Sequence, residues 1–471
     1  MSARSDLVLG DVEVAGRRVD VIVAHGQVAA VTEAGTAEVA GVEVVTGAGG
    51  ALLPGLHDHH LHLLAMAAAR ASVAVGPGEV HDRAGLRRAL RTAPMATDGW
   101  VRAVGYHESV AGPLDRWVLD ELAPDRPVRV QHRTGAAWFL SSSALERLGL
   151  ADPVGDRSGP DGVELDGSGR PTGRIYGNDL LVRRGGPAPD LAPVGRALAS
   201  CGVTGVTDAT PYRDAAGFEP LVAAVEGGQL AQRVVVTGGP DLAGARLPAA
   251  LGTGPVKLVV ADHGLPDLDG LAADIDRAHR HDRPVAVHCV TRAGLVLALA
   301  AWDQAGARRG DRVEHASVAP PELRTHMARL GLTVVTQPGF VAERGDQYRT
   351  DVDGDDVPHL YPCRSLEADG VPVGGSTDAP YSSADPWDAI GAAVDRQTAS
   401  GSVLGPDERL TPQRALELFL TPLDDPGGRP RRVEVGAPAD LCLLALPLAE
   451  ALRSPTSSAV RATFRAGTRI W

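Results

Sequence analysis

Residues 54–62 of this chain have the sequence Pro-Gly-Leu-His-Asp-His-His-Leu-His. Side chains of an extended strand alternate between two faces, so His60 and His62 share one face. His57 and His59 then lie on the opposite face. Two imidazoles at positions i and i+2 on one face can chelate a single metal ion. The stretch therefore predicts a strand that carries metal ligands, and it opens the part of the chain where strands and helices alternate.

Short strands separated by turns lie before this stretch and at the far end of the chain. Residues 5–53 contain short apolar runs punctuated by glycines, which is typical of a β-meander and not of β-α-β units. The same pattern returns at 440–446 and 460–467. We therefore expect a small β-sandwich domain formed by both termini, with residues 1–53 as its N-terminal part and residues 426–471 as its C-terminal part.

Between these ends, apolar strands alternate with amphipathic helical patches. From residue 203 onward the strands recur about every twenty to thirty residues, as the βα units of a barrel do. The predicted fold class is α/β, with a (β/α)8 TIM-type barrel over residues 54–425. Residues near 75–190 are rich in Pro, Gly and Arg and break this rhythm, which indicates an insertion.

Composition excludes several functional classes. The net charge of -13 is spread along the 471 residues, and aromatic residues make up only 4%. This argues against nucleic-acid partners and anionic membranes and favours a small-molecule substrate. The four cysteines are far apart in the sequence and predict no disulfide framework. Without a leader or a long apolar run, we expect a cytoplasmic protein, for which a homodimer is one possible state.

Lys257 is the only lysine among the 46 lysines and arginines of the chain. It lies in the apolar segment 254–262, which predicts a buried strand. Arginine stays protonated in proteins, whereas a desolvated lysine can become a neutral, nucleophilic amine. Such an amine can form a Schiff base with a carbonyl, or add CO2 to give a carbamate that binds metal. The alternative is a structural lysine whose buried stem carries its charge outward.

Further metal-ligating residue types follow later strands. His288 and His315 end two apolar strands, and Asp378 follows the second candidate strand after His315. The carboxyl ends of barrel strands face the active site, so these residues should meet His60, His62 and Lys257 there. Nitrogen and oxygen donors of this kind suit zinc, manganese, iron or cobalt. The sequence therefore predicts a divalent metal centre.

Several short motifs are shared with a known family. They are Val-Lys-Leu at 256–258, Arg-Val-Glu-His-Ala at 312–316, Thr-Gln-Pro at 336–338, Gly-Ser-Thr-Asp-Ala-Pro at 375–380, Asp-Pro at 385–386 and Ala-Ala-Val-Asp-Arg at 392–396. With the histidine stretch, this order resembles the amidohydrolase superfamily over nearly the whole chain. Within it, the motifs resemble the amidohydrolase-3 branch that includes N-substituted formamide deformylases.

That resemblance implies a ligand set. His60, His62 and Asp378 would bind a first metal. Lys257, carboxylated on its Nζ, would bridge to a second metal held by His288 and His315. One or two divalent ions are implied per chain, with zinc as the leading candidate. Asp378 would act as the catalytic residue that accepts a proton from the attacking water and delivers it to the leaving amine.

Departures from the branch concern the substrate pocket. The run after His288 lacks a usual Gly-Asp pair, Gly-Tyr-His-Glu at 105–108 replaces a common Trp-Asp pair, and Thr-Gly-Ala at 134–136 lacks a frequent histidine. His107, Arg344 and Tyr348 are candidate substrate-binding residues.

The remaining motifs receive structural interpretations. Residues 339–369 are expected to form a long polar loop that covers the pocket as a lid. Arg312 and Glu314 are expected to form a buried ion pair. His279 and His281, in a polar stretch, are expected at the surface.

The favoured function is hydrolysis of an amide or formamide C–N bond by a metal-activated water. The same centre could instead act on a cyclic amide, an ester or a heterocyclic amine, the last as a deaminase. A Schiff-base lyase that uses Lys257 is a further alternative. A non-catalytic binding protein on the same fold predicts missing ligands, and the sequence has every ligand.

Overall fold

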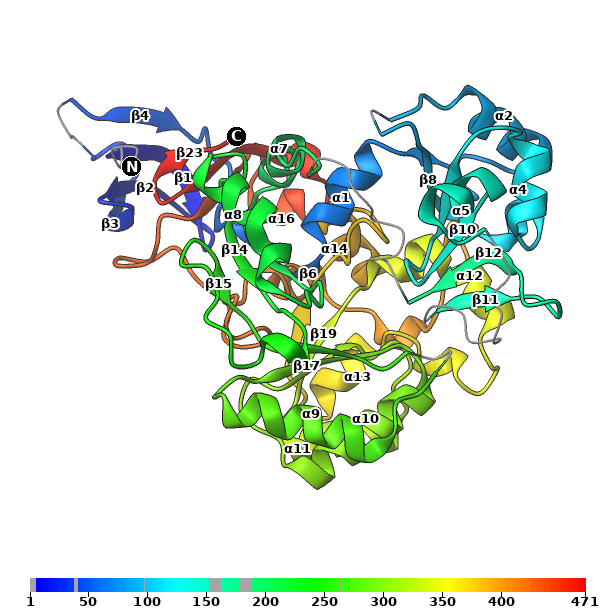
Figure 1. Cartoon of the computed structure of the whole chain (residues 1–471). Helices are drawn as coiled ribbons and strands as arrows, with labels where there is room; N and C mark the ends of the chain where they lie inside the picture. Colours follow the sequence, from blue (N-terminus) through cyan, green and yellow to red (C-terminus); the bar gives the residue numbers. More distant parts are fainter. Residues whose placement is uncertain (1–5, 38–40, 97, 152–161, 178–187, 262–263) are drawn as a thin grey trace. The chain divides into compact units, whose positions relative to one another are not determined.

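The computed structural model describes residues 6–37, 41–96, 98–151, 162–177, 188–261 and 264–471. The chain divides into two compact units. Unit 1 contains Met1–Leu63 and Leu191–Trp471, and unit 2 contains Leu64–Asp190. Each unit has its own sheets and its own apolar core, and each is described by itself (Figure 1).

The centre of unit 1 consists of parallel strands in two sheets. A four-stranded sheet has the order β15-β14-β13-β6, and a five-stranded sheet has the order β16-β17-β18-β19-β20. The strands are β6 (Leu56–Leu61), β13 (Val203–Asp208), β14 (Arg233–Val236), β15 (Gly252–Thr253), β16 (Val256–Val259), β17 (Val285–Cys289), β18 (Arg312–His315), β19 (Thr333–Thr336) and β20 (Val373–Gly375). Most of these residues are buried, as expected for parallel strands covered on both faces.

Backbone hydrogen bonds connect the two parallel sheets at both edges. The amide of Lys257 on β16 donates to the carbonyl of Gly238, which follows β14 (2.8 Å). At the other edge, the amide of Asp378 donates to the carbonyl of His60, and the amide of His62 donates to the carbonyl of Ala379 (both 2.8 Å). These last two bonds fix the end of β6 beside the segment that follows β20.

Helices lie between the strands of unit 1. They are α7 (Ala192–Ser200), α8 (Glu219–Glu226), α9 (Leu268–Arg280), α10 (Arg292–Ala305), α11 (Pro321–Leu330), α12 (Gly339–Asp351), α13 (Cys363–Ala368), α14 (Pro386–Asp395), α15 (Pro412–Glu417) and α16 (Leu448–Ala451). The 3-10 turns are η1 (Ala215–Phe218), η2 (Pro240–Leu242), η3 (Val357–His359), η4 (Pro406–Glu408) and η5 (Ser457–Ala459). Figure 1 shows α9, α10 and α11 side by side. Asp267 caps α9 by accepting hydrogen bonds from two amides of its first turn.

Both termini contribute sheets to unit 1. The N-terminal sheet contains β1 (Leu7–Val14), β2 (Arg17–Ala24), β3 (Gln27–Glu33) and β4 (Glu43–Thr46). The C-terminal sheet contains β21 (Leu441–Leu444), β22 (Val460–Arg465), β23 (Thr468–Arg469) and, from the other end of the chain, β5 (Leu52–Pro54). Leu9, Val21, Leu441 and Phe464 belong to one apolar core. The two ends of the chain therefore bury their apolar side chains together.

The segment 339–369 is not a long polar loop, and that prediction is wrong. It contains α12, η3 and α13. Phe340, Val341 and Leu360 are buried in an apolar cluster that α12 shares with its neighbours. Apolar side chains scattered among many charges are enough for this cluster, although they leave no clear helical period in the sequence.

Unit 2 has a six-stranded sheet with the order β11-β12-β10-β9-β8-β7. Its elements are α1 (Leu63–Arg70, which starts at the boundary), β7 (Val73–Ala74), α2 (Arg83–Thr92), β8 (Val101–Tyr106), α3 (Glu108–Ala111), α4 (Arg116–Leu122), β9 (Val128–His132), β10 (Ala137–Leu140), α5 (Ser142–Leu148), β11 (Val163–Leu165) and β12 (Pro171–Tyr176). Strands β7, β8 and β9 run parallel. None of the described helices of the chain has both the length and the apolar character needed to cross a bilayer.

Candidate metal centre

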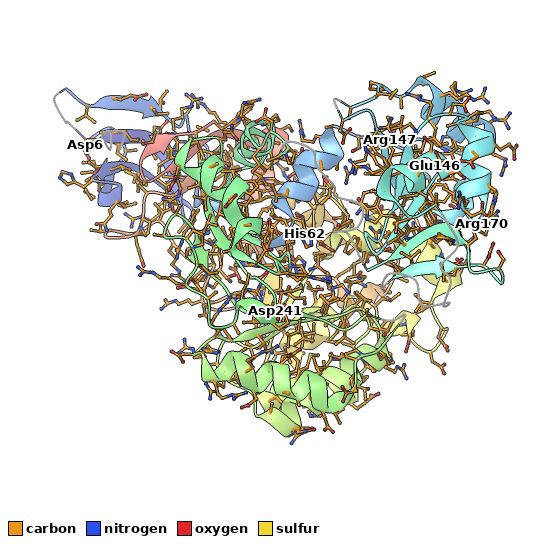
Figure 2. All side chains as sticks on the ribbon, in the orientation of Figure 1. Asp6, His62, Glu146, Arg147, Arg170 and Asp241 are labelled. Carbon is orange, nitrogen blue, oxygen red and sulfur yellow. The ribbon has the colours of Figure 1, made fainter. Side chains whose placement is uncertain are left out.

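The end of β6 carries two of the predicted ligands. His60 is fully buried, and His62, which is labelled in Figure 2, follows the strand with 16% of its side chain exposed. Their ring centroids are 5.3 Å apart. The pKa of His60 is lowered to about 3, because burial and then the nearby Lys257 disfavour its charged form more than Glu314 and Asp378 favour it. A neutral imidazole is the form that binds metal.

Asp378 lies against both histidines. Its Oδ1 is 3.2 Å from Nε2 of His62 and 3.5 Å from Nε2 of His60. The backbone of Asp378 is left-handed (φ 59°), a conformation that is uncommon for residues other than glycine. Burial alone would raise the pKa of this carboxyl, but the hydrogen bond from His62 and the charges of His60 and His315 outweigh burial and lower the pKa.

Glu314, on β18 of the five-stranded sheet, orients His60 on β6 of the four-stranded sheet. Its Oε2 accepts a hydrogen bond from Nδ1 of His60 at 2.6 Å, and its Oε1 accepts one from Nε of Arg312 at 2.7 Å. The predicted ion pair between Arg312 and Glu314 is therefore present. Sequence reasoning missed the contact between Glu314 and His60. This contact keeps the proton of the neutral ring on Nδ1 and leaves Nε2 of His60 without a proton. Carboxylates that support metal-binding histidines act in this way.

Gln337 has the same relation to His315. The side-chain carbonyl of Gln337 accepts a hydrogen bond from Nδ1 of His315 at 2.8 Å, and its amide nitrogen donates to Oγ of Ser376 at 2.9 Å. Nε2 of His315 is buried and has no hydrogen-bond partner in the described part of the chain. Its ring lies 4.9 Å from that of His60 and 4.4 Å from that of His288, measured between centroids. The imidazoles of three different strands thus converge.

Lys257 is 2% exposed, and its Nζ has no hydrogen-bond partner among the described residues. Burial lowers the pKa of its amine, although the negative charges of Glu314 and Asp378 partly oppose this effect. An unpaired buried amine is costly for the folded state. Its presence in the interior, close to two carboxylates, excludes the alternative of a lysine that carries its charge outward to solvent.

His57 and His59 lie on the other face of β6. Nδ1 of His57 contacts the carbonyl of Thr421 at 2.9 Å, and Nε2 of His59 contacts the hydroxyl of Thr421 at 2.8 Å. These contacts connect β6 to the segment after α15. The two histidines therefore have structural partners of their own.

The three substrate-binding candidates have different surroundings. The guanidinium of Arg344 lies 4.3 Å from the ring centroid of Phe340 and donates to the carbonyl of Tyr381. The hydroxyl of Tyr348 lies 3.3 Å from that of Tyr361. His107 belongs to unit 2, where Glu108 and His132 are its neighbours.

Tyr381 was missed by the sequence reasoning. Its ring centroid is 5.5 Å from that of His62, in an edge-to-face arrangement. The signal that could have revealed it is its position three residues after Asp378 in a segment that must return from the strand end.

His279 is a further correction, since it is buried and not at the surface. Its Nε2 lies 3.0 Å from Oδ2 of Asp311. The period of the buried residues Leu271, Ile275 and Ala278 on α9 is the signal that would have placed His279 on the inner side.

Ligand atoms of His60, His315 and Asp378 lie within 4.8 Å of one another, which is the spacing of side chains that can share a metal ion. His62 and His288 adjoin this group through their rings. Buried imidazoles with oriented Nδ1 atoms, an ionised carboxylate and an unpartnered amine fit a divalent cation. This donor set therefore forms a candidate metal centre at the carboxyl ends of the parallel strands.

Comparison with known proteins identifies the family. The model of the amidohydrolase family matches residues 43–470, so the chain belongs to this family and is a hydrolase of carbon–nitrogen bonds other than peptide bonds. The chain is 28% identical to N-substituted formamide deformylase of Arthrobacter pascens over 490 aligned positions, which cover 90% of this chain and 89% of the relative.

Solved structures share the fold. A metal-dependent hydrolase from Pyrococcus horikoshii superposes with a TM-score of 0.73 at 20% identity, covering 94% of this chain and 97% of the other. N-isopropylammelide isopropylaminohydrolase from Burkholderia multivorans superposes with a TM-score of 0.55 at 18% identity, covering 99% and 98%.

Proposed function

We propose that this enzyme hydrolyses an amide or formamide C–N bond of a small molecule, with N-substituted formamides as the leading substrate class. The observation that carries the proposal is the convergence of His60, His315 and Asp378, each held in place by a separate hydrogen bond. The similarity to a formamide deformylase over 90% of the chain supports the substrate class.

The proposed fold places these residues at one mouth of a closed (β/α)8 barrel formed by β6, β13, β14, β16, β17, β18, β19 and β20. Backbone hydrogen bonds at both edges of the parallel sheets support closure. The two terminal sheets would form a β-sandwich around their common core. Residues near 75–190 would form an insertion after the first barrel strand.

The residues that would hold metal fall into two groups. His60, His62 and Asp378 would hold one ion, and His288 and His315 would hold a second, with zinc as the proposed metal. Bound there, divalent cations lower the pKa of a water molecule and polarise the carbonyl group of the substrate. Lys257 would join the two groups as a carbamate, after its neutral amine adds to CO2 and releases one proton. The unpartnered buried Nζ favours that chemistry.

Asp378 would carry the proton between water and the leaving nitrogen. Its lowered pKa keeps the carboxylate ionised near neutral pH and able to accept a proton. Oδ1 faces Nε2 of His62, and the backbone bond to His60 keeps the carboxylate near this position during the reaction. The same oxygen would then donate the proton to the amine, which leaves as a neutral molecule.

Residues near His62 would contact the substrate. The ring of Tyr381 lies edge-to-face against His62, and Arg344 fixes the backbone of Tyr381 through its carbonyl. An aromatic surface beside the reacting group suits an aryl or alkyl substituent on the nitrogen. Arg344 would therefore act mainly by positioning Tyr381.

A substrate panel tests the proposal with zinc-loaded, full-length enzyme. N-alkyl and N-aryl formamides should be hydrolysed with release of formate. Cyclic amides, esters and amino-substituted heterocycles should react much more slowly. A higher kcat/KM for any of these three classes than for every formamide would reject the formamide assignment. Covalent trapping of substrate on Lys257 by borohydride would instead support a Schiff-base lyase.

A further inference from the structure

Unit 2 contains a second group of metal-ligating side chains that the barrel site does not use. His107 directly follows β8, and His132 is the last residue of β9. The two strands are parallel neighbours in which Tyr106 pairs with His132. Both histidines therefore lie at the carboxyl ends of adjacent strands. This is the same topological position as the histidines of the barrel.

Glu108 brings a carboxylate between the two imidazoles. Its Oε2 is 3.2 Å from Nε2 of His132 and 3.9 Å from Nε2 of His107. Ligand atoms of the three residues lie within 4.8 Å of one another. Around a tetrahedral ion with metal–nitrogen bonds of about 2.0 Å, neighbouring ligand atoms are about 3.3 Å apart. One of the three distances is already close to that value, and small side-chain movements would bring the other two to it.

Both rings are held by contacts at their other nitrogen. Nδ1 of His107 lies 2.9 Å from the hydroxyl of Ser109, and Nδ1 of His132 lies 2.8 Å from the hydroxyl of Thr134. The backbone amides of Ser109 and Thr134 donate to these same Nδ1 atoms at 3.2 and 3.3 Å, so the proton of each neutral ring lies on Nε2 and leaves when a cation binds there. The edge of Phe139 also packs against His132. Both rings are thus held at Nδ1, and a cation bound between His132 and Glu108 would replace the proton that Nε2 of His132 shares with the carboxylate.

Charge and exposure suit an exchangeable ion. About 15% of the His132 side chain and 44% of the Glu108 side chain are exposed, so solvent reaches the group. The hydrogen bond from His132 lowers the pKa of Glu108 to about 2 despite partial burial, and the carboxylate is ionised at neutral pH. Water can complete the coordination of a cation on the exposed side.

We infer that His107, Glu108 and His132 form a second binding site for a divalent transition metal, such as zinc, within unit 2. Two imidazoles and one carboxylate favour zinc, cobalt or nickel over magnesium and calcium, which prefer oxygen ligands. The site needs no residue of unit 1. Its existence is independent of the proposed function, and it gives the predicted substrate-binding residue His107 a different role.

Metal stoichiometry of the full-length chain tests the inference. Chelator-treated protein is dialysed against micromolar free zinc, and bound zinc is measured by elemental analysis. Wild type should bind one equivalent more than His132→Asn. His60→Asn should lose barrel metal but keep the equivalent in unit 2. If the barrel site bound no metal, wild type would still bind one more equivalent of zinc than His132→Asn. The experiment therefore tests the unit 2 site independently of the proposed function.

Two further variants make the test decisive. His81→Asn is the matched control, because His81 is an exposed histidine of the same unit whose Nδ1 contacts a carbonyl. It should bind as much zinc as wild type. Glu108→Gln keeps the side-chain volume and should weaken zinc binding in unit 2 by at least about tenfold. Circular dichroism verifies that each variant is folded. Equal zinc content and affinity in folded wild type, His132→Asn and Glu108→Gln would overturn the inference.

Discussion

The two ends of the parallel strands of unit 1 both bury a carboxylate beside histidine, but they treat it in opposite ways. At the amino end, Asp311 directly precedes β18 and accepts hydrogen bonds from the amides of Val285 and Arg308 and from Nε1 of Trp302 (2.9, 2.9 and 3.0 Å). His279 completes this group. Every oxygen of Asp311 has partners from several chain segments.

At the carboxyl end, polar atoms are buried without such partners. Nζ of Lys257 and Nε2 of His315 have none among the described residues. A buried polar group without a hydrogen bond costs about 1–3 kcal/mol of folding free energy. The amino end therefore stabilises the fold, whereas the carboxyl end keeps buried polar atoms unpaired at a cost in stability, as a ligand-binding site would require. Barrel enzymes divide stability and catalysis in this way.

The largest effect on catalytic activity is expected for Asp378→Asn, at the carboxyl end of the strands. The amide cannot carry the proton and binds metal poorly, so kcat should fall by about 10⁴-fold, the upper end of the range for general acid–base catalysis. Thermal stability of the metal-free protein should fall only slightly, because loss of the favourable contacts with the histidines is offset by removal of a buried charge. Steady-state kinetics and thermal unfolding measure the two quantities. A loss of stability as large as that expected for Asp311→Ala would contradict the difference between the two ends.

Asp311→Ala should lower stability strongly and leave catalytic activity nearly unchanged, the opposite of Asp378→Asn. It leaves several buried donors unpaired and should lower the free energy of unfolding by about 3–5 kcal/mol. Chemical denaturation measures this loss, while kcat of the folded fraction should remain near wild type. Asp311→Asn is the milder control, because it retains oxygen acceptor capacity. A stable Asp311→Ala variant would show that the network contributes little.

Lys257→Arg tests the role of the single lysine. Arginine keeps the charge but cannot form a carbamate, so activity should fall by about 10²–10³-fold, the range for removal of one electrostatic group. Metal content should fall with it. Lys257→Ala should also be inactive, with partial rescue by formate or acetate. Full activity and metal content in Lys257→Arg would contradict the proposed role.

Glu314→Gln should have an intermediate effect. The amide can no longer fix the Nδ1 proton of His60 by charge, so metal affinity should fall by about 10–100-fold. Competition with a chromophoric chelator measures the affinity. The buried Arg312 also loses its counter-ion, and a parallel unfolding measurement separates that loss of stability from the loss of affinity.

The smallest effect on the amount of bound metal is expected for His57→Asn. His57 contacts Thr421 on the face of β6 opposite His60, so zinc content should stay near wild type. His60→Asn is the matched comparison on the other face and should lose metal. If both variants lost metal equally, the two faces of β6 would not differ in the way that we describe.

Sequence reasoning succeeded where local pattern decides the structure. Alternation along residues 54–62 separated His60 from His57, because strand geometry fixes which side chains share a face. The strands that carry Lys257, His288 and His315 were recognisable as apolar runs. Reasoning failed for 339–369 and for His279, where burial depends on what packs against the segment and not on its own polarity.

The sequence by itself determined the chemistry available to this protein. It supplied the donor types, their order along the chain and the motifs of the amidohydrolase family, because covalent order and strand periodicity are local properties. Only the tertiary structure decided that Glu314 supports His60, that Gln337 supports His315 and that Tyr381 lies against His62. The physical reason is that these contacts join separate strands, and their distances arise only when the strands pack around one core.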